Sequence, residues 1–180
     1  METHKNKIPD LKNLVRLLDY SKYLYEQENK RNEKLSSSTN IYLVVITFTF
    51  TLLVGFLGFI PPKQRFMSLG LNDWVYISLS TCLGISVMLI LLALIFTLLV
   101  VKVRPFESLC NIKEFIYEAE HYETEEELVG SMITHYAVAT EKNIPLNNEK
   151  AKFLKLALLS FNIGFIILLF ALTGFFILGR

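Results

Sequence analysis

Cysteine, proline and glycine are all scarce in this chain of 180 residues, which holds 2 Cys, 5 Pro and 8 Gly. Two cysteines are too few for the framework of a small secreted disulfide-rich domain. The low Gly and Pro content, together with a hydrophobic fraction of 52%, excludes a disordered or collagen-like chain. The formal net charge of +1 gives no signature of nucleic-acid binding by itself. The class of protein must therefore be inferred from where the apolar residues lie.

Motifs of the common enzyme classes are also missing. The sequence contains no HExxH, phosphate-binding loop, GxSxG or CxxC motif, and its three histidines have no recognised nucleophile or metal-ligand spacing. One acidic cluster has the residue types of a metal site: Glu118, Glu120, His121 and Glu123. A solvated helix end before the next helix start explains the same residues. We therefore expect no enzyme, no catalytic residue, no metal and no cofactor.

Charge is absent from three long stretches, Ile41 to Ile60, Trp74 to Val101 and Leu156 to Gly179. A helix of about 20 mainly apolar residues suffices to cross the hydrocarbon core of a membrane. Each stretch reaches that length, so the sequence predicts an all-α membrane protein with three transmembrane helices. Because the spans lack Asp, Glu, Lys, Arg and His, a proton relay or a charge-coupled transporter is not expected.

Lysine and arginine are distributed unevenly around these stretches: eight precede the first, two lie between the first and second, and seven lie between the second and third. Because positive residues favour the cytoplasmic side, we expect a multi-pass protein of a bacterial inner membrane with a cytoplasmic N-terminus and an external C-terminus. No cleavable signal peptide is expected, since a long polar segment precedes the first span. The expected segments are a cytoplasmic amphipathic helix (1–40), the first span (41–60), a short external loop (61–73), the second span (74–101), a cytoplasmic helical loop (102–152), the third span (153–178) and an external tail (179–180).

The N-terminal segment and the second loop are predicted to form a small helical cytoplasmic domain. Asp10 has the type and place of a helix start, the charged run 25–34 is expected to be solvated, and residues 36–39 are expected to break or bend the helix. In the second loop, Pro105 should end any helix that leaves the second span. A short helix is expected around residues 108–120.

Two further helices are expected after that. Thr124 and Glu127 have the spacing of a capping box, and the helix that they open should end near Asn143, before Pro145. Asn147 is then expected to cap a last helix that runs into the third span without interruption. Such a continuous rod can carry an event in the cytoplasm into the membrane.

Small and hydroxylated residues recur at intervals of four in the spans, and such stripes let helices approach closely. The residues are Thr47, Thr51 and Gly55 in the first span, Ser78, Cys82 and Ser86 in the second, and Ser160 and Gly164, with Asn162 between them, in the third. Helix packing explains the pattern. The alternative is that one stripe lines a pore in an oligomer, because three helices alone cannot enclose a water path.

Basic residues gather next to the ends of the spans that face the cytoplasm: Lys30, Arg31, Lys34, Lys102, Arg104, Lys150, Lys152 and Lys155. Attraction to anionic lipid and the setting of topology explain such a collar. The functional alternative is a phosphate-binding site for a nucleotide or oligonucleotide signal. In that case Tyr136, Asn143 and Asn147 are the candidate stacking and polar contacts.

Two runs resemble small bacterial membrane effectors that occur with anti-phage defence operons: YLYEQENKRNEKLSSSTNIYLVV and HYAVATEKNIPLNNEKAKFLKLALLSFNIGF. The plan of the chain is similar to that of SLATT, Pycsar-type and Hailong-type transmembrane effectors. Many of those have two or four spans, whereas three are counted here, and no appended ligand-binding domain is present.

The resemblance implies an oligomeric effector of abortive infection that opens a pore, as an ion channel does, or disrupts the inner membrane. It implies a homo-oligomer in the lipid bilayer, which responds to a nucleotide-type signal or to a partner nucleotidyltransferase or sensor protein. The alternative from another class is a non-conducting membrane anchor or scaffold that recruits a soluble partner enzyme through the N-terminal helix.

Overall fold

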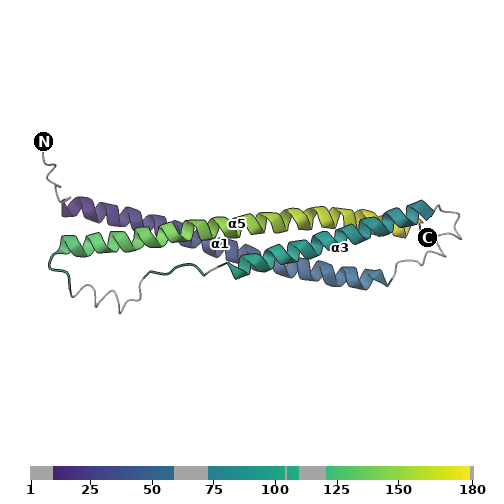
Figure 1. Cartoon of the computed structure of the whole chain (residues 1–180), viewed down its shortest axis with the longest axis horizontal. Coiled ribbons are helices and arrows are strands. Elements are labelled where there is room, and N and C mark those ends of the chain that lie inside the picture. Colours follow the sequence, from purple (N-terminus) through teal and green to yellow (C-terminus); the bar gives the residue numbers. More distant parts are fainter. Residues whose placement is uncertain (1–9, 59–72, 104, 110–120, 179–180) are drawn as a thin grey trace, which may run out of the picture. The chain divides into compact units, whose positions relative to one another are not determined.

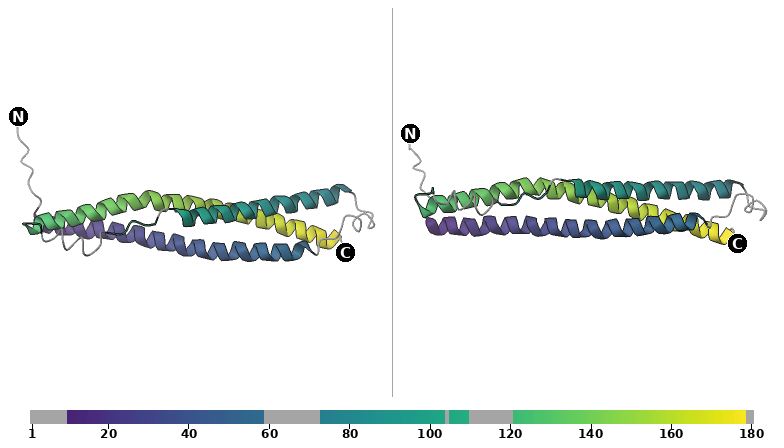
Figure 2. Two further views of the ribbon diagram at one scale, coloured as in Figure 1. Left: turned by 60° about the horizontal axis from the view of Figure 1, so that its bottom comes forward. Right: turned by 90° about the horizontal axis from the view of Figure 1, so that it is seen from below.

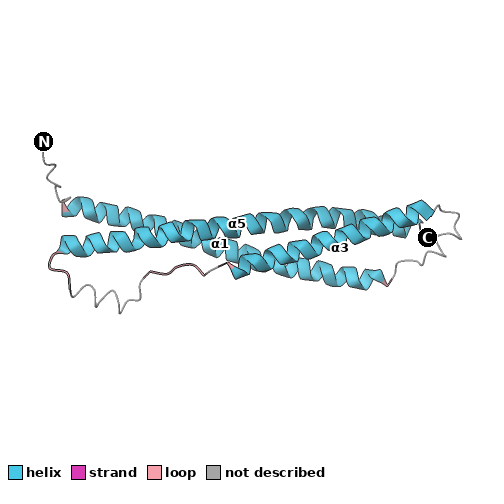
Figure 3. Cartoon of the chain, in the orientation of Figure 1, coloured by secondary structure: helices cyan, strands magenta, loops and turns pink. Residues whose placement is uncertain are grey.

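The computed structural model describes residues 10–58, 73–103, 105–109 and 121–178. These residues form three α-helices, α1 (Leu11–Leu57), α3 (Asp73–Lys102) and α5 (Glu125–Leu178), labelled in Figure 1, and Figure 3 shows no strand among the described segments. Each of the three helices is long and apolar enough to cross a membrane. The all-α class and the three candidate spans are therefore confirmed. The short helix expected around 108–120 falls mostly outside the described residues, and residues 108 and 109 are not helical.

The helix ends follow the local chemistry of the sequence. α1 begins directly after Asp10, and α3 ends ahead of Pro105, as expected. The hydroxyl of Thr124 accepts a hydrogen bond from the backbone N–H of Glu127 at 3.3 Å. The carboxylate of Glu127 in turn accepts the backbone N–H of Glu123 at 3.2 Å. The capping box thus forms, with its return bond displaced by one residue from the usual pattern.

The expected break at residues 36–39 is wrong, because α1 runs through them as one helix. Thr39 is buried, and its hydroxyl donates to the backbone carbonyl of Leu35 at 2.7 Å. Ser and Thr are weak helix formers because their side chains compete for backbone hydrogen bonds. Here the hydroxyl bonds within the helix and the side chain packs, so burial of the helix outweighs the local preference.

The expected end near Asn143 and the expected cap at Asn147 are also wrong, because α5 continues through both residues and through Pro145. A proline inside a helix removes one backbone hydrogen bond and crowds the carbonyl four residues earlier. Pro145 and Glu141, which carries that carbonyl, are both exposed. Water can therefore solvate the carbonyl, while Asn143 and Asn147 are buried on either side of the proline.

The chain divides into two compact units. Unit 1 comprises Met1–Lys34 and Arg104–Asn148, and unit 2 comprises Leu35–Val103 and Glu149–Arg180. α1 and α5 each contribute residues to both units. The short segment 105–109, which follows α3, belongs to unit 1.

The core of unit 2 is the seam where the last part of α1, all of α3 and the last part of α5 lie side by side (Figure 2). On α3 the buried residues follow alternating steps of four and three: Leu79, Leu83, Ser86, Ile90, Ala93, Thr97 and Val100. A mean repeat of 3.5 residues is the seam of a coiled coil. Ile46 and Leu53 of α1 and Leu168, Ala171 and Phe175 of α5 complete this core.

Candidate functional site

The segment 105–109 is fastened to α5 by the side chain of Asn143, which is fully buried. Its Nδ2 donates to the backbone carbonyl of Glu107 at 2.9 Å, and its Oδ1 accepts the backbone N–H of the same residue at 2.8 Å. The amide thus satisfies both backbone groups of Glu107 in the way that a neighbouring β-strand would. This pair of bonds fixes where the segment lies along α5 within unit 1.

A second polar contact joins α1 to α5 within unit 1. The Nδ2 of Asn147 donates to the backbone carbonyl of Glu28 at 2.9 Å and to its Oε2 at 2.7 Å. Arg31 lies 3.5 Å from the same Oε2 and donates to Oδ1 of Asn148 at 2.8 Å. The Oδ1 of Asn147 is buried without a hydrogen-bond partner among the described residues, which costs about 1–3 kcal/mol. A buried asparagine at such a seam fixes helix register at a cost in stability.

An aromatic contact lies in the same unit. The ring of Tyr25 on α1 lies 5.6 Å from that of Phe106 and 5.7 Å from that of Tyr136 on α5, measured between centroids. The pair with Tyr136 is edge-to-face, a favoured arrangement for aromatic rings. Tyr136, expected as a stacking contact for a base, is therefore engaged with another ring of the chain.

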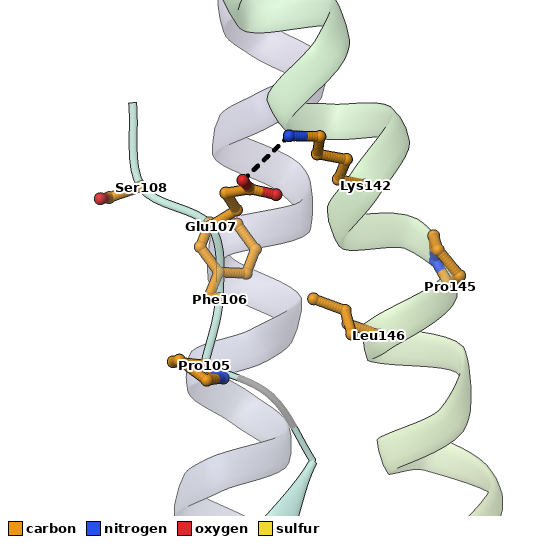
Figure 4. A pocket seen from close by; sticks show the side chains of 7 residues that line it. All are labelled: Pro105, Phe106, Glu107, Ser108, Lys142, Pro145 and Leu146. Carbon is orange, nitrogen blue, oxygen red and sulfur yellow. Dashed lines mark hydrogen bonds and ion pairs between the residues drawn. The ribbon is translucent and has the colours of Figure 1, made fainter. Parts of the chain in front are cut away.

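Two cavities of unit 1 lie around one ion pair. The Nζ of Lys142 donates to Oε1 of Glu107 at 3.0 Å (Figure 4). The larger cavity, of about 690 Å³, is lined by Pro105, Phe106, Glu107, Ser108, Lys142, Pro145 and Leu146. The second, of about 290 Å³, shares Glu107, Ser108 and Lys142 with it and adds His135. These cavities are the candidate ligand site of unit 1.

The lining sets what this candidate site can bind. Its larger cavity falls in the size range of pockets for small molecules, and Phe106 and Leu146 give it apolar walls. The side chains of Lys142 and Glu107 are 56% and 48% exposed, so their ion pair contributes at most about 1 kcal/mol. Lys142 and Glu107 can therefore exchange their ion pair for contacts with a ligand at little cost in free energy. A small amphipathic molecule fits this lining.

The basic candidates from the sequence differ in exposure. Lys30, Lys34, Lys102, Lys152 and Lys155 are exposed, Arg31 is half-buried, Lys150 is buried, and Arg104 lies outside the described residues. Unit 1 brings Arg31 together with Asn147 through Glu28. The amides of Asn143 and Asn147 are engaged within the chain, so a nucleotide would have to displace those bonds to use them.

The small and polar span residues differ in exposure. Ser86, Ser160 and Gly164 are buried, Cys82 is half-buried, and Thr47, Thr51, Gly55, Ser78 and Asn162 are exposed. A Cβ added at Gly164 would lie 2.9 Å from Cβ of Leu89 and 3.2 Å from the carbonyl oxygen of Ser86. Gly164 and Ser86 therefore take part in close packing of α3 against α5 in unit 2, whereas pore lining by the exposed members stays a prediction.

Several residues that make these contacts were not predicted from the sequence. Glu28 lies in the charged run expected to be solvated, yet its side chain is only 18% exposed. The place of Glu28 at the contact between helices could have been predicted from the sequence. Leu14, Ser21 and Glu28 follow a spacing of seven, which is the repeat of a coiled-coil seam. Glu107 and Phe106 carry no such signal. Of the alternative metal ligands, Glu118 and Glu120 lie outside the described residues.

Comparison of the chain with protein-family models, with curated proteins and with solved structures gave no match. What the protein does is therefore argued from its own residues.

Proposed function

We propose that this chain is a homo-oligomeric inner-membrane effector of bacterial antiviral defence, which forms or gates a pore, or disrupts the membrane, in response to a nucleotide-type signal or a partner protein. The resemblance of its two runs to defence effectors supports the biological role. The three apolar helices support a multi-pass membrane protein. In this proposal unit 1 is the cytoplasmic domain, with the N-terminus inside and the C-terminus outside, as the distribution of Lys and Arg favours.

The main support for an oligomer comes from Asn162, whose side-chain amide is exposed within the third apolar stretch. No hydrogen-bond partner is present for it among the described residues. Hydrocarbon cannot satisfy an amide, so lipid contact at this position is unfavourable. Asn side chains in spans hydrogen-bond across helix contacts and drive association. A second copy of the chain, or water inside an oligomer, would supply the missing partner.

The exposed hydroxyls of α1 are different, because they are satisfied within their own helix. Thr47 donates to the carbonyl of Leu43 at 2.7 Å, and Thr51 donates to the carbonyl of Thr47 at 3.0 Å. Such threonines can face lipid without leaving a donor unpaired. Asn162 is therefore the sharper test of association, and Thr47 is its control.

Asn162→Leu is expected to weaken self-association about tenfold, because the substitution removes a polar contact worth about 1–2 kcal/mol in a membrane. Ion flux through liposomes that contain the purified protein should fall in parallel. The measurement is the oligomer distribution in detergent and in vesicles, together with flux at matched protein density. Thr47→Val should leave self-association unchanged, because the Thr47 hydroxyl is satisfied within its own helix. A wild-type protein that is monomeric, or a leucine variant with wild-type association, contradicts the proposal.

Expression in bacteria tests the defence role. The protein, alone or with its partner and signal, is expected to depolarise cells and stop growth, because an open pore dissipates the membrane potential. A potential-sensitive dye and growth curves give the readout. Cells that stay polarised and keep growing with the partner both absent and present would overturn this role.

A non-conducting anchor is the second candidate, and one surface favours it. The first part of α1 exposes large apolar side chains, namely Val15, Leu17, Tyr20, Tyr23 and Leu24. An exposed apolar surface of this kind can hold a soluble partner. Liposome flux separates the two candidates, because an anchor gives none at any protein density.

A further inference from the structure

One exposed side of α1 in unit 1 carries basic and aromatic residues in a regular pattern. Its residues follow alternating steps of four and three, and all six are exposed: Arg16, Tyr20, Tyr23, Gln27, Lys30 and Lys34. Tyr23 comes two residues after the buried Ser21, which is about half a turn, so this α1 stripe faces away from the buried side of the helix. None of the six residues is acidic. A mean step of 3.5 residues is the repeat with which one helix packs along another.

α5 has a stripe of the same repeat on an outer side of the same unit. Its residues follow alternating steps of three and four: Glu127, Gly130, Thr134, Ala137, Glu141 and Ile144. Gly130 is half-buried and the other five are exposed. Glu141 comes two residues before the fully buried Asn143, so this α5 stripe also faces away from the buried side of its helix. None of its six residues is basic.

The charges of the two stripes have the same spacing. Arg16 and Lys30 are 14 residues apart on α1, and Glu127 and Glu141 are 14 residues apart on α5. A parallel register can therefore place Arg16 opposite Glu127. The same register places Lys30 opposite Glu141. A carboxylate accepts several hydrogen bonds, so the capping bond through Oε2 of Glu127 does not prevent such a pair.

The side chains between these charges are complementary in size. Between its two basic residues the α1 stripe has the large rings of Tyr20 and Tyr23, which are 58% and 55% exposed. Between its two glutamates the α5 stripe has only small side chains, those of Gly130, Thr134 and Ala137. Large residues opposite small ones allow two helices to interdigitate. Charge and size thus match in one and the same register.

The two stripes do not meet within one chain. Tyr25 contacts Tyr136, and Glu28 contacts Asn147, so α1 and α5 run parallel in unit 1 and touch through other sides than the stripes. The α1 stripe of one copy can meet the α5 stripe of another. Copies that are inserted alike in a membrane share one orientation, which keeps the two helices of such a contact parallel.

We propose that unit 1 of one copy binds unit 1 of the next by packing its α1 stripe against the neighbour's α5 stripe. Two different surfaces meet in this contact, so each copy has one of each to offer, and the arrangement can close into a ring. The inference rests on the proposed function for the shared orientation of the copies, and it deepens that proposal by naming the contact between them. It needs neither a pore nor a signal molecule.

The test uses charge reversal in the full chain, purified in a non-ionic detergent at low ionic strength. Lys30→Glu and Glu141→Lys each place like charges opposite one another, so each is expected to weaken self-association about tenfold. An equimolar mixture of the two variants should regain wild-type association, because each then supplies the charge that the other needs. Analytical ultracentrifugation measures the oligomer distribution of each variant and of the mixture.

Lys22→Glu is the matched control, since it makes the same change of charge at an exposed position of α1 outside the stripe. It should associate as the wild type does. Thermal unfolding of each variant provides a check on folding. Added salt should weaken wild-type association, because exposed ion pairs are screened.

Rescue by mixing supports the proposal, since a contact within one chain would not be restored by a second variant. A loss that mixing does not restore overturns it, as does an equal loss in Lys22→Glu. Wild-type association in all variants leaves the α1 stripe to a soluble partner and overturns it as well. If Asn162→Leu dissociates the oligomer and Lys30→Glu does not, only this inference fails. Rescue by mixing in a protein that conducts no ions overturns only the pore of the proposed function.

Discussion

Gly164→Ala is expected to lower the free energy of unfolding of unit 2 by about 1–3 kcal/mol, the usual cost of overpacking a filled core. The added Cβ would lie 2.9 Å from Cβ of Leu89 and 3.2 Å from the backbone oxygen of Ser86. Neither atom is the end of a flexible side chain, so α3 and α5 must move apart. Denaturant or thermal unfolding of the purified protein in detergent measures the effect.

Gly84→Ala is the control for this prediction. Gly84 is exposed on α3, and a Cβ there would meet nothing within 4 Å. Both substitutions gain the same helix propensity, about 1 kcal/mol, so the difference between them isolates the clash. Gly84→Ala should be neutral or stabilising. If Gly164→Ala is as stable as Gly84→Ala, α3 and α5 do not pack as closely at this point as described.

Asn143→Ala is expected to destabilise unit 1 by about 2–3 kcal/mol, because two hydrogen bonds of about 1 kcal/mol each are lost from a fully buried site. The backbone N–H and carbonyl of Glu107 lose their partners. The segment 105–109 should then loosen from α5. Hydrogen exchange of the Glu107 amide should speed up along with the fall in unfolding midpoint, and that local readout distinguishes this effect from general destabilisation.

Asn148→Ala serves as the comparison, since Asn148 is exposed and makes a single bond to Arg31 at the surface. Asn148→Ala should lower the free energy of unfolding by less than about 1 kcal/mol. Asn143→Asp keeps the acceptor for the Glu107 amide but loses the donor to its carbonyl, so it should not restore wild-type stability. Full stability of either Asn143 variant would contradict the role assigned to this side chain.

The helix ends show how far local sequence could predict the fold. The start after Asp10, the capping box at Thr124 and the end before Pro105 each depend on a few neighbouring residues, and all three are found. The interruptions at residues 36–39 and at Pro145 were expected on equally local grounds and are wrong. There, burial of Thr39 and of the asparagines beside Pro145 outweighs propensity, because packing contributes more to a long helix than its intrinsic preference does.

The polar contacts of unit 1 could not be predicted from local sequence either. Arg31, Asn143 and Asn147 were singled out in the sequence as contacts for a signal molecule, whereas in the structure they contact other residues of the chain. Asn147 and Glu28 are 119 residues apart in the chain, and no local pattern pairs them. Only the seven-residue spacing of α1 places Glu28 on the seam.

The sequence by itself determined the all-α class of this protein. Its three uncharged apolar stretches are long enough to cross a membrane, and a helix satisfies the backbone polar groups of such a stretch internally. It also determined the start of α1 after Asp10 and the capping box at Thr124. The tertiary structure alone decided that α1 and α5 run without interruption, which small residues are buried, and that Lys150 is buried too. The reason is that burial depends on what faces a residue across the helices, and those partners come from distant parts of the chain.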